Sequence, residues 1–260
     1  MKGRDSHYSV RLARDARDLR AAQRLRYRVF VEELGGDGAL VDHENRLERD
    51  AFDEIVDHLI LVDRRCDPEA LEDVVGVYRL LPGARLAPGE RFYSESEFDL
   101  TALRASGRPL LELGRSCVEA DHRGGTAMVH LWNGLAEYVL SRGIEILFGV
   151  ASFHGTDLAA LAQSLSFLHH NHRSPEALRV RAIGPSAVDM AMLPPDKVDR
   201  KTAMLGTPAL IKGYLRLGGH VGEGAFVDHA FNTTDVCLVM DTARMSERHR
   251  DFYTRKAASK

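Results

Sequence analysis

The chain has 260 residues, of which 44% are hydrophobic and 28% are charged, and its formal net charge is −3. These values are typical of a globular protein with a substantial core, and they exclude disordered and fibrous classes and a generally basic nucleic-acid binder. No apolar run approaches the length of about 18 residues that a spanning helix needs, and the charged N-terminus argues against a secretory signal. The three cysteines have no paired or metal-like spacing, which predicts a cytoplasmic protein.

Sequence patterns predict elements in chain order. We expect strands over 9–13, 58–63, 74–81, 110–118, 144–151 and 235–240, and helices from Asp15 to about Glu33, over 127–141 and over 158–169. Residues 37–57 indicate an acidic loop, 86–108 a loop-rich excursion, and 178–210 an irregular stretch. Strands and helices alternate along the whole chain, which favours one α/β domain with insertions.

Charge is distributed unevenly along the chain. Residues 2–28 contain nine Lys or Arg and three Asp, whereas residues 32–57 contain ten acids and two arginines. Residues 242–260 return to six bases and two acids. These runs indicate either solvated, salt-bridged surfaces or a basic face for an acidic partner beside an acidic pocket for a cationic substrate.

The strand over 110–118 and the helix over 127–141 are joined by a glycine-containing loop. Backbone amides at a glycine-rich helix start bind anions, and Arg123 adds a cation beside them. We therefore expect Arg123, Gly124, Gly125 and Thr126 to bind a phosphate, with an ordinary tight turn as the alternative.

This junction, His122-Arg-Gly-Gly-Thr-Ala127, resembles the diphosphate loop of GNAT acyltransferases, with His122 where that family usually has Gln or Arg. Segments 25–34 and 111–118 are similar to the acyl-homoserine-lactone synthases. Segments 150–157, 208–217 and 226–235 most resemble the N-acyltransferases of bacterial ornithine-lipid synthesis. The resemblance spans nearly the whole chain. It implies a GNAT-like mixed central sheet flanked by helices, with a core over about 8–172 and a C-terminal extension over about 173–260.

The resemblance also implies an activity, namely transfer of a 3-hydroxyacyl chain from acyl carrier protein to the α-amino group of L-ornithine, which gives lyso-ornithine lipid. The carrier protein would be the donor and partner, with no tightly bound cofactor. The alternatives are an acyl-homoserine-lactone synthase, a coenzyme-A-dependent N-acyltransferase, or a non-catalytic module that binds an acyl protein or a membrane surface.

Glu112 lies inside an apolar strand, where a carboxylate is costly unless it is paired or used. We expect it to act as general base near the incoming amine, with an ion pair to an arginine as the alternative. In a regular strand Glu112 and Gly114 would face one way and Arg115 the other, so Arg115 is expected to pair with acids of 42–57.

The side-chain ammonium of ornithine needs carboxylates. We expect them to come from Asp50, Asp53 and Asp57, and we expect further substrate contacts from Asp228, His229 and Asn232. No metal is expected, because the histidines of 169–172 lack nearby carboxylates and are predicted to lie in an exposed loop. The basic residues 243–260 suggest weak, electrostatic contact with an anionic membrane at its inner face.

Overall fold

The computed structural model describes residues 7–244. These residues form two compact units, one made of residues up to 81 together with 113–142, and the other of 82–112 together with residues from 143 onward. Strand β5 (Leu110–Val118) contributes its first three residues to the second unit and the rest to the first. The predicted division into a core and an extension at about residue 172 stays a prediction.

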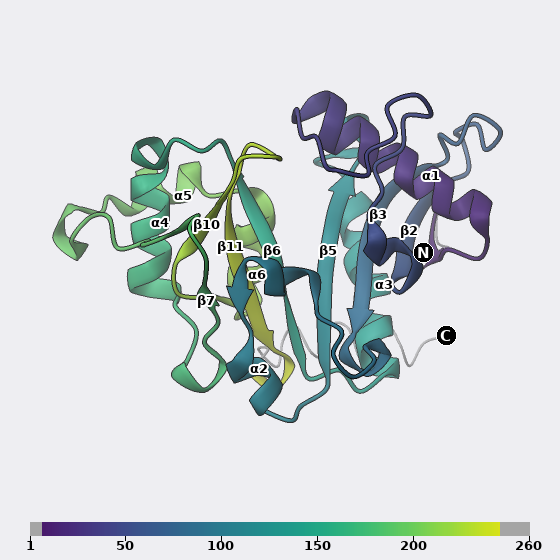
Figure 1. Ribbon diagram of the computed structural model, residues 1–260. Helices are drawn as coiled ribbons and strands as arrows, with labels where there is room; N and C mark the ends of the chain where they lie inside the picture. The colour runs from purple at the N-terminus through teal and green to yellow at the C-terminus, as the bar shows by residue number, and fades with distance from the viewer. Residues whose placement is uncertain (1–6, 245–260) are drawn as a thin grey trace, which may run out of the picture. The chain divides into compact units, whose positions relative to one another are not determined.

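The first unit is a sheet with a helix on each face (Figure 1). Its strands β1 (Tyr8–Leu12), β2 (Asp57–Asp63) and β3 (Val74–Pro82) are antiparallel neighbours, followed by β5. Helix α1 (Ala16–Arg26) packs Leu25 against Ile60 and Val77. Helix α3 (Ala127–Ser141) lies on the opposite face, so close that a Cβ at Gly76 would meet Leu131 at 2.8 Å.

The helical segment that starts with α1 begins and ends as the sequence indicates. The Asp15 side chain accepts a hydrogen bond from the Asp18 amide, as expected of an N-cap. The last turns form a π-helix over Tyr27–Glu33, and Gly35 follows with φ +74°. A left-handed glycine is a common way to end a helix.

The second unit continues from β5 through a row of strands. The start of β5 pairs in parallel with β6 (Ile146–His154), which pairs antiparallel with β11 (Thr233–Asp241). Strand β10 (Ala225–Asp228) forms a hairpin with β11 and pairs with β8 (Ala187–Val188), and β9 (His220–Val221) also pairs with β11. A separate ribbon joins β4 (Phe98–Asp99) to β7 (Arg181–Ala182).

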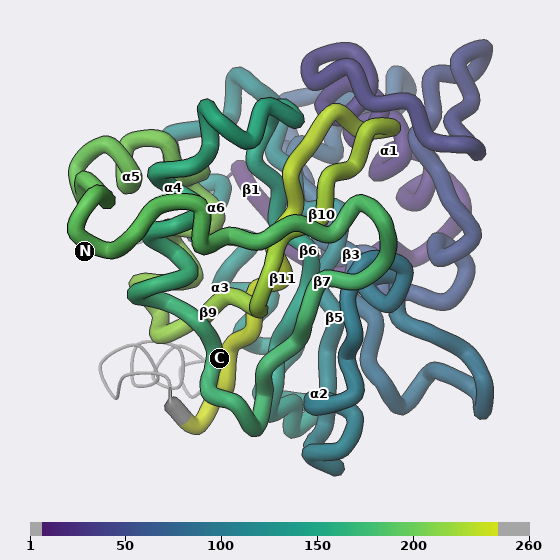
Figure 2. The backbone as a smooth tube through the Cα atoms, turned by 60° about the vertical axis from the view of Figure 1, so that its left-hand side comes forward, coloured from purple at the N-terminus to yellow at the C-terminus, as the bar shows by residue number. Residues whose placement is uncertain are grey.

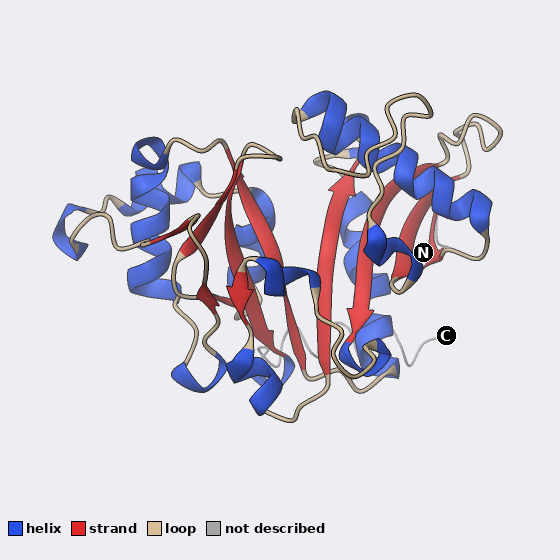
Figure 3. Cartoon of the chain, viewed as in Figure 1, coloured by secondary structure: helices blue, strands red, loops and turns tan. Residues whose placement is uncertain are grey.

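The helices of the second unit are α2 (Thr101–Ala105), α4 (Leu158–His172), α5 (Arg200–Gly206) and α6 (Ala209–Arg216). Short 3₁₀ turns over Ala51–Glu54 (η2) in the first unit and Tyr93–Ser96 (η4) in the second carry residues of the site described below. Figure 2 shows α4, α5 and α6 grouped beside the strands, and Figure 3 shows how much loop connects them. No helix within residues 7–244 is long and apolar enough to cross a membrane.

Most of the predicted architecture is confirmed. The chain is α/β with a mixed sheet flanked by helices, and the bounds predicted for β5 and α3 coincide with those observed. Several predictions were wrong in detail. Strand β6 begins two residues and ends three residues later than predicted, and β11 begins two residues earlier. Strand β10 and helix α5 were not predicted, and His169–His172 belong to the end of α4 rather than to a loop.

Candidate active site

Glu112 is held in a fixed position by the turn η4. The side chain is 5% exposed on β5, and its Oε1 accepts hydrogen bonds from the Ser94 amide at 2.7 Å and the Ser94 hydroxyl at 2.6 Å. Its Oε2 accepts from the Tyr93 amide at 2.9 Å. Three donors thus stabilise a buried charge in an apolar strand, which satisfies the requirement that such a carboxylate be partnered.

The loop before α3 presents open backbone. Gly124 has φ +74°, and a Cβ added at Gly124 or Gly125 would meet no atom within 4 Å. Thr126 precedes the first helical residue, but its side chain makes no capping hydrogen bond. Since the first amides of a helix have no intrahelical acceptor, this helix start is chemically suited to an anion.

The cationic side chains beside this loop are engaged with acids. Arg123 donates to both carboxylate oxygens of Glu33, at 2.5 and 2.6 Å, and to the Val118 carbonyl at 2.8 Å. His122 Nε2 lies 3.2 Å from Asp63 Oδ2. The backbone amides of the loop are therefore the groups most open to a phosphate.

A buried ion network occupies the first unit. It contains three arginines and three acids from five parts of the chain, which are Arg26, Arg79, Arg115, Glu48, Asp50 and Asp53. Arg26 is fully buried and donates to Asp53 at 2.7 and 2.8 Å, and its Nε lies 2.6 Å from Glu48. Arg79 reaches Asp50 at 2.6 Å and Asp53 at 3.1 Å.

The network balances charge in a largely buried place, in which Asp50 and Arg115 are the partly exposed members. Burial alone would raise the pKa of Asp53, but the guanidinium groups of Arg26 and Arg79 hold it far below its usual range. In Glu48 and Asp50, too, burial alone would raise the pKa. The charges of the arginines outweigh this effect, so both pKa values are lowered. The pKa of nearby His58 is lowered because burial disfavours its charged form. The acids of the network are therefore carboxylates at neutral pH.

Two of the three acids predicted to bind the ornithine ammonium, Asp50 and Asp53, belong to this network. Both oxygens of Asp53 are bonded to arginines or to Gln23, and Asp50 is bonded to Arg79 and lies 3.4 Å from Arg115. Asp57 accepts a hydrogen bond from the Tyr138 hydroxyl at 2.7 Å. Binding of ornithine at these three residues stays a prediction, but arginines already neutralise two of them.

Arg115 pairs with the acidic segment as predicted, through Glu48 at 2.9 Å and Asp50. The strict alternation expected along this part of β5 was wrong. A Cβ at Gly114 would point towards Arg79, which binds the same Asp50 that Arg115 approaches. Arg115 has φ +47°, a left-handed conformation that breaks the alternation of a regular strand.

The predicted contacts near the C-terminus lie at the β10–β11 hairpin. Asp228 is half-buried, and its Oδ1 accepts from the amides of Ala230 and Phe231. His229 and Asn232 are exposed in the turn, where Asn232 has φ +51°. Residues 232–235, which end at Asp235, were grouped with Asp228 and His229 in the sequence as a possible lining of a site. The sequence reasoning did not single out Glu97, whose carboxylate lies with that of Asp235 within 4.8 Å of the one on Asp228.

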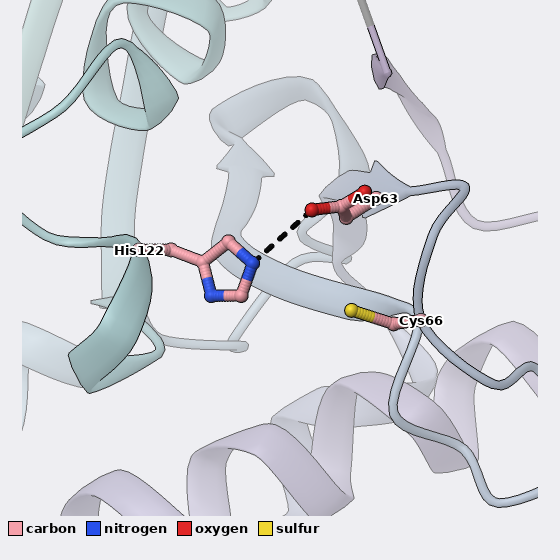
Figure 4. A group of neighbouring side chains, drawn as sticks. All are labelled: Asp63, Cys66 and His122. Atoms are coloured by element: carbon pink, nitrogen blue, oxygen red, sulfur yellow. Dashed lines mark hydrogen bonds and ion pairs between the residues drawn. The ribbon is translucent and has the colours of Figure 1, made fainter.

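A second cluster of possible metal ligands contains Asp63, Cys66 and His122 (Figure 4). Arg65 donates to both oxygens of Asp63, which lowers the pKa of that carboxyl, so a cation already occupies the position of a metal. Burial raises the pKa of the Cys66 thiol, and the Asp63 charge adds to the effect. These residues do not fit a metal site, because a coordinating thiol must lose its proton.

The buried thiols are poor nucleophiles. Burial raises the pKa of Cys117 to about 12, and it also raises the pKa of Cys237. Both side chains are buried, so the structure agrees with a packing role for Cys117.

Comparison with known proteins decides the family. The family model described as "Acetyltransferase (GNAT) domain" matches residues 25–133. The L-ornithine N(alpha)-acyltransferase of Rhodobacter capsulatus is 63% identical over 249 residues, which are 96% of this chain and 95% of that protein. The chain belongs to the L-ornithine N(alpha)-acyltransferase family. A second member of this family, from Brucella abortus, is 40% identical over 98% of this chain and 92% of its own.

Among solved structures, the AHL synthase LasI matches with a TM-score of 0.50 and 16% identity, covering 91% of each chain. At this identity the likeness shows the fold alone, and the fold agrees with the GNAT domain found by the family model. The predicted resemblance to GNAT acyltransferases and to the ornithine N-acyltransferases is confirmed, and the chain is an N-acyltransferase.

Proposed function

We propose that this chain transfers a 3-hydroxyacyl group from acyl carrier protein to the α-amino group of L-ornithine, forming lyso-ornithine lipid. The observation that carries the proposal is the 63% identity, across 96% of the chain, with a protein named L-ornithine N(alpha)-acyltransferase. The open helix start at Gly124–Thr126 supports a donor that carries a phosphate.

In the proposed reaction the neutral α-amine attacks the thioester carbonyl, and the tetrahedral intermediate collapses to an amide and a thiol. The proton lost by the amine passes to Glu112, directly or through water, and the leaving thiolate takes up a proton. The amides of Gly124, Gly125 and Thr126 bind the phosphate of the donor. Arg123 gives up its ion pair with Glu33 and binds the same phosphate. The role of Glu112 rests on its fixed, buried carboxylate.

Two observations favour the carrier protein over coenzyme A as donor. First, His122 is bonded to Asp63, so among residues 119–127 only Arg123, once it leaves Glu33, offers a cation, whereas coenzyme A has several phosphates. Second, Arg14 and Arg20 are exposed on or near α1, and Arg20 and Arg24 make no ion pair with any residue between 7 and 244. An exposed basic helix suits an acidic carrier protein.

Mass spectrometry of the products tests the activity. Purified protein is incubated with 3-hydroxyacyl carrier protein or the matching coenzyme A ester, and with ornithine, lysine, glutamine or glycine. We expect an ornithine amide, formed faster from the carrier protein. Acylation of another amino acid in preference to ornithine would overturn the substrate, and a faster reaction with coenzyme A would overturn the donor.

The role of Glu112 is tested with Glu112→Gln and Ser94→Ala. In Glu112→Gln the side-chain N–H₂ would face a backbone N–H, and two donors repel each other. The variant should therefore be less stable than wild type, so turnover is measured per folded molecule. We expect a loss on the order of 10²–10⁴-fold that shrinks as pH rises, because more amine is then already neutral. Ser94→Ala, which keeps the carboxylate, should stay active. Equal turnover of folded Glu112→Gln and wild type would reject the base.

The product has a long acyl chain, and we propose weak contact with an anionic membrane surface from the inner face. The basic segment that motivates this, 243–260, lies almost entirely outside the described residues. Its bases would each contribute about 1 kcal/mol near such a surface.

A further inference from the structure

Three carboxylates converge in the second unit. They belong to Glu97, directly after η4, to Asp228 at the end of β10, and to Asp235 in β11, and one oxygen of each lies within 4.8 Å of the others. Glu97 is 4% exposed and Asp235 is 3% exposed. Carboxylates this close repel one another, and burial strengthens that repulsion, so the group favours a bound cation.

The strand register explains why these side chains meet. Asp228 lies opposite Thr233, and Phe226 opposite Asp235, in the β10–β11 pair. Opposite residues of an antiparallel pair face the same side, and so do residues two apart. Asp228, Thr233 and Asp235 therefore share one face of the sheet.

Thr233 provides an independent sign of a ligand. Thr233 is only 8% exposed, and its Oγ1 has no hydrogen-bond partner within residues 7–244. It lies on the shared face, directly across from Asp228 and two residues before Asp235. Since buried hydroxyls are normally hydrogen-bonded, a ligand that completes this site should bring a donor.

The same face also carries the candidate base. Glu112 pairs with Phe148 of β6, and Phe148 pairs with Val239 of β11, so Glu112 and Asp235 are on one side of the sheet. Their Cα atoms are about 16 Å apart, estimated from two strand spacings and four residues along β11. The exposed Ser152 and His154, opposite Asp235 and Thr233, lie on this face as well.

A primary ammonium fits this group of acceptors. It offers three N–H donors on a single positive charge, and the site offers three carboxylates and one hydroxyl oxygen. We propose that Glu97, Asp228, Asp235 and the Thr233 hydroxyl bind the side-chain ammonium of ornithine and so select a basic amino acid. This inference rests on the proposed function, and it assigns the ammonium to acids other than Asp50, Asp53 and Asp57.

The test compares L-ornithine with L-2-aminopentanoate, which has the same carbon chain and no side-chain ammonium. The variants are Asp235→Asn and the less buried Asp228→Asn. Each removes one charge from a crowded group, which should relieve repulsion and preserve folding. Glu145→Gln is the control, because Glu145 is an exposed acid of the same unit that pairs with Arg108. Aminopentanoate is measured both as a substrate and as a competitive inhibitor. Its affinity is thus obtained whether or not it is acylated.

We expect kcat/KM for ornithine to fall about 10–100-fold in both site variants, as for loss of a charged hydrogen bond, with aminopentanoate unaffected and the control equal to wild type. Equal losses for both amino acids, or no loss for ornithine, would overturn the proposal. So would stabilisation of wild type, but not Asp235→Asn, by Mg²⁺, Ca²⁺ or Zn²⁺ when ornithine has no such effect. Failure of the wild type to acylate ornithine at all would instead reject the proposed function.

Discussion

Replacing Asp53 by Asn should strongly destabilise the first unit. The carboxylate of Asp53 accepts hydrogen bonds from Arg26, Arg79 and Gln23 at 2.7–3.1 Å. Arg26 is 0% exposed and Arg79 is 3% exposed, so neither guanidinium can regain water unless the unit opens. The variant leaves three arginines facing two acids.

Removing one partner of a buried ion pair costs about 3–5 kcal/mol. In a protein of this size each kcal/mol shifts Tm by about 2–4 °C, so we expect Asp53→Asn to lower Tm by about 10 °C. Thermal unfolding followed by circular dichroism and urea unfolding both measure the change. The matched control is Glu32→Gln, which removes an exposed acid paired with Arg46 and should change stability by about 0–1 kcal/mol.

A loss of stability in Asp53→Asn that is as small as the loss in Glu32→Gln would refute this reasoning, because it would mean that water reaches Arg26 and Arg79. A fall in stability without loss of turnover per folded molecule would assign Asp53 to structure alone. Loss of turnover in a well-folded variant would instead return Asp53 to the substrate contacts predicted from the sequence.

Other predictions concern pH, docking, packing and membranes. The pKa values of Glu48, Asp50 and Asp53 lie below their usual range, so the folded state binds fewer protons than the unfolded state. The stabilisation that these ionised acids contribute is therefore complete above about pH 4.5 and is lost as the pH falls further. Urea unfolding from pH 7 to pH 3 should show this loss, and a flat profile would contradict it. Reversing Arg20 and Arg24 to Glu should raise KM for the carrier protein, more so at low salt, and leave a free acyl-pantetheine donor unaffected; unchanged carrier kinetics would move docking elsewhere. Gly134→Ala should destabilise, because a Cβ there would lie 2.3 Å from a methyl of Val10, whereas Gly125→Ala, with open space, should not; equal Tm values would be inconsistent with this packing. Deleting 246–260 should reduce low-salt sedimentation with anionic vesicles but leave transfer in detergent intact, and equal sedimentation would reject that contact.

The sequence predicted the elements whose patterns are long and regular. The 15 residues of α3 and the nine of β5 have strong helical and strand patterns, and their bounds were found without error. Strand β10 has only four residues, and its pattern is too short to stand out from a loop. The π-helical turns after α1 also leave no clear trace, because their residues continue the helical spacing.

The candidate site was predictable only where chain neighbours form it. The loop over Arg123–Thr126 is local, and its glycines and helix start are visible in the sequence. The partners of Asp53 come from segments 26 and 30 residues away, and Glu97 and Asp235 are separated by more than half the chain. Which acid meets which arginine depends on tertiary contacts that no local pattern encodes. The left-handed backbone of Arg115 could not be anticipated either, since arginine has no preference for it.

The inert thiols have a kinetic consequence. All three cysteines have pKa values raised by burial, to about 12 for Cys117, so none is a ready thiolate at neutral pH. The acyl chain should then never rest on a protein sulfur between donor and amine. We therefore expect direct transfer, with both substrates bound at once in a ternary complex, and double-reciprocal plots that intersect rather than run parallel. In the proposed reaction, the thioester should then remain intact on its carrier when ornithine is absent, so that a cell short of the amine does not lose its activated acyl groups through this enzyme.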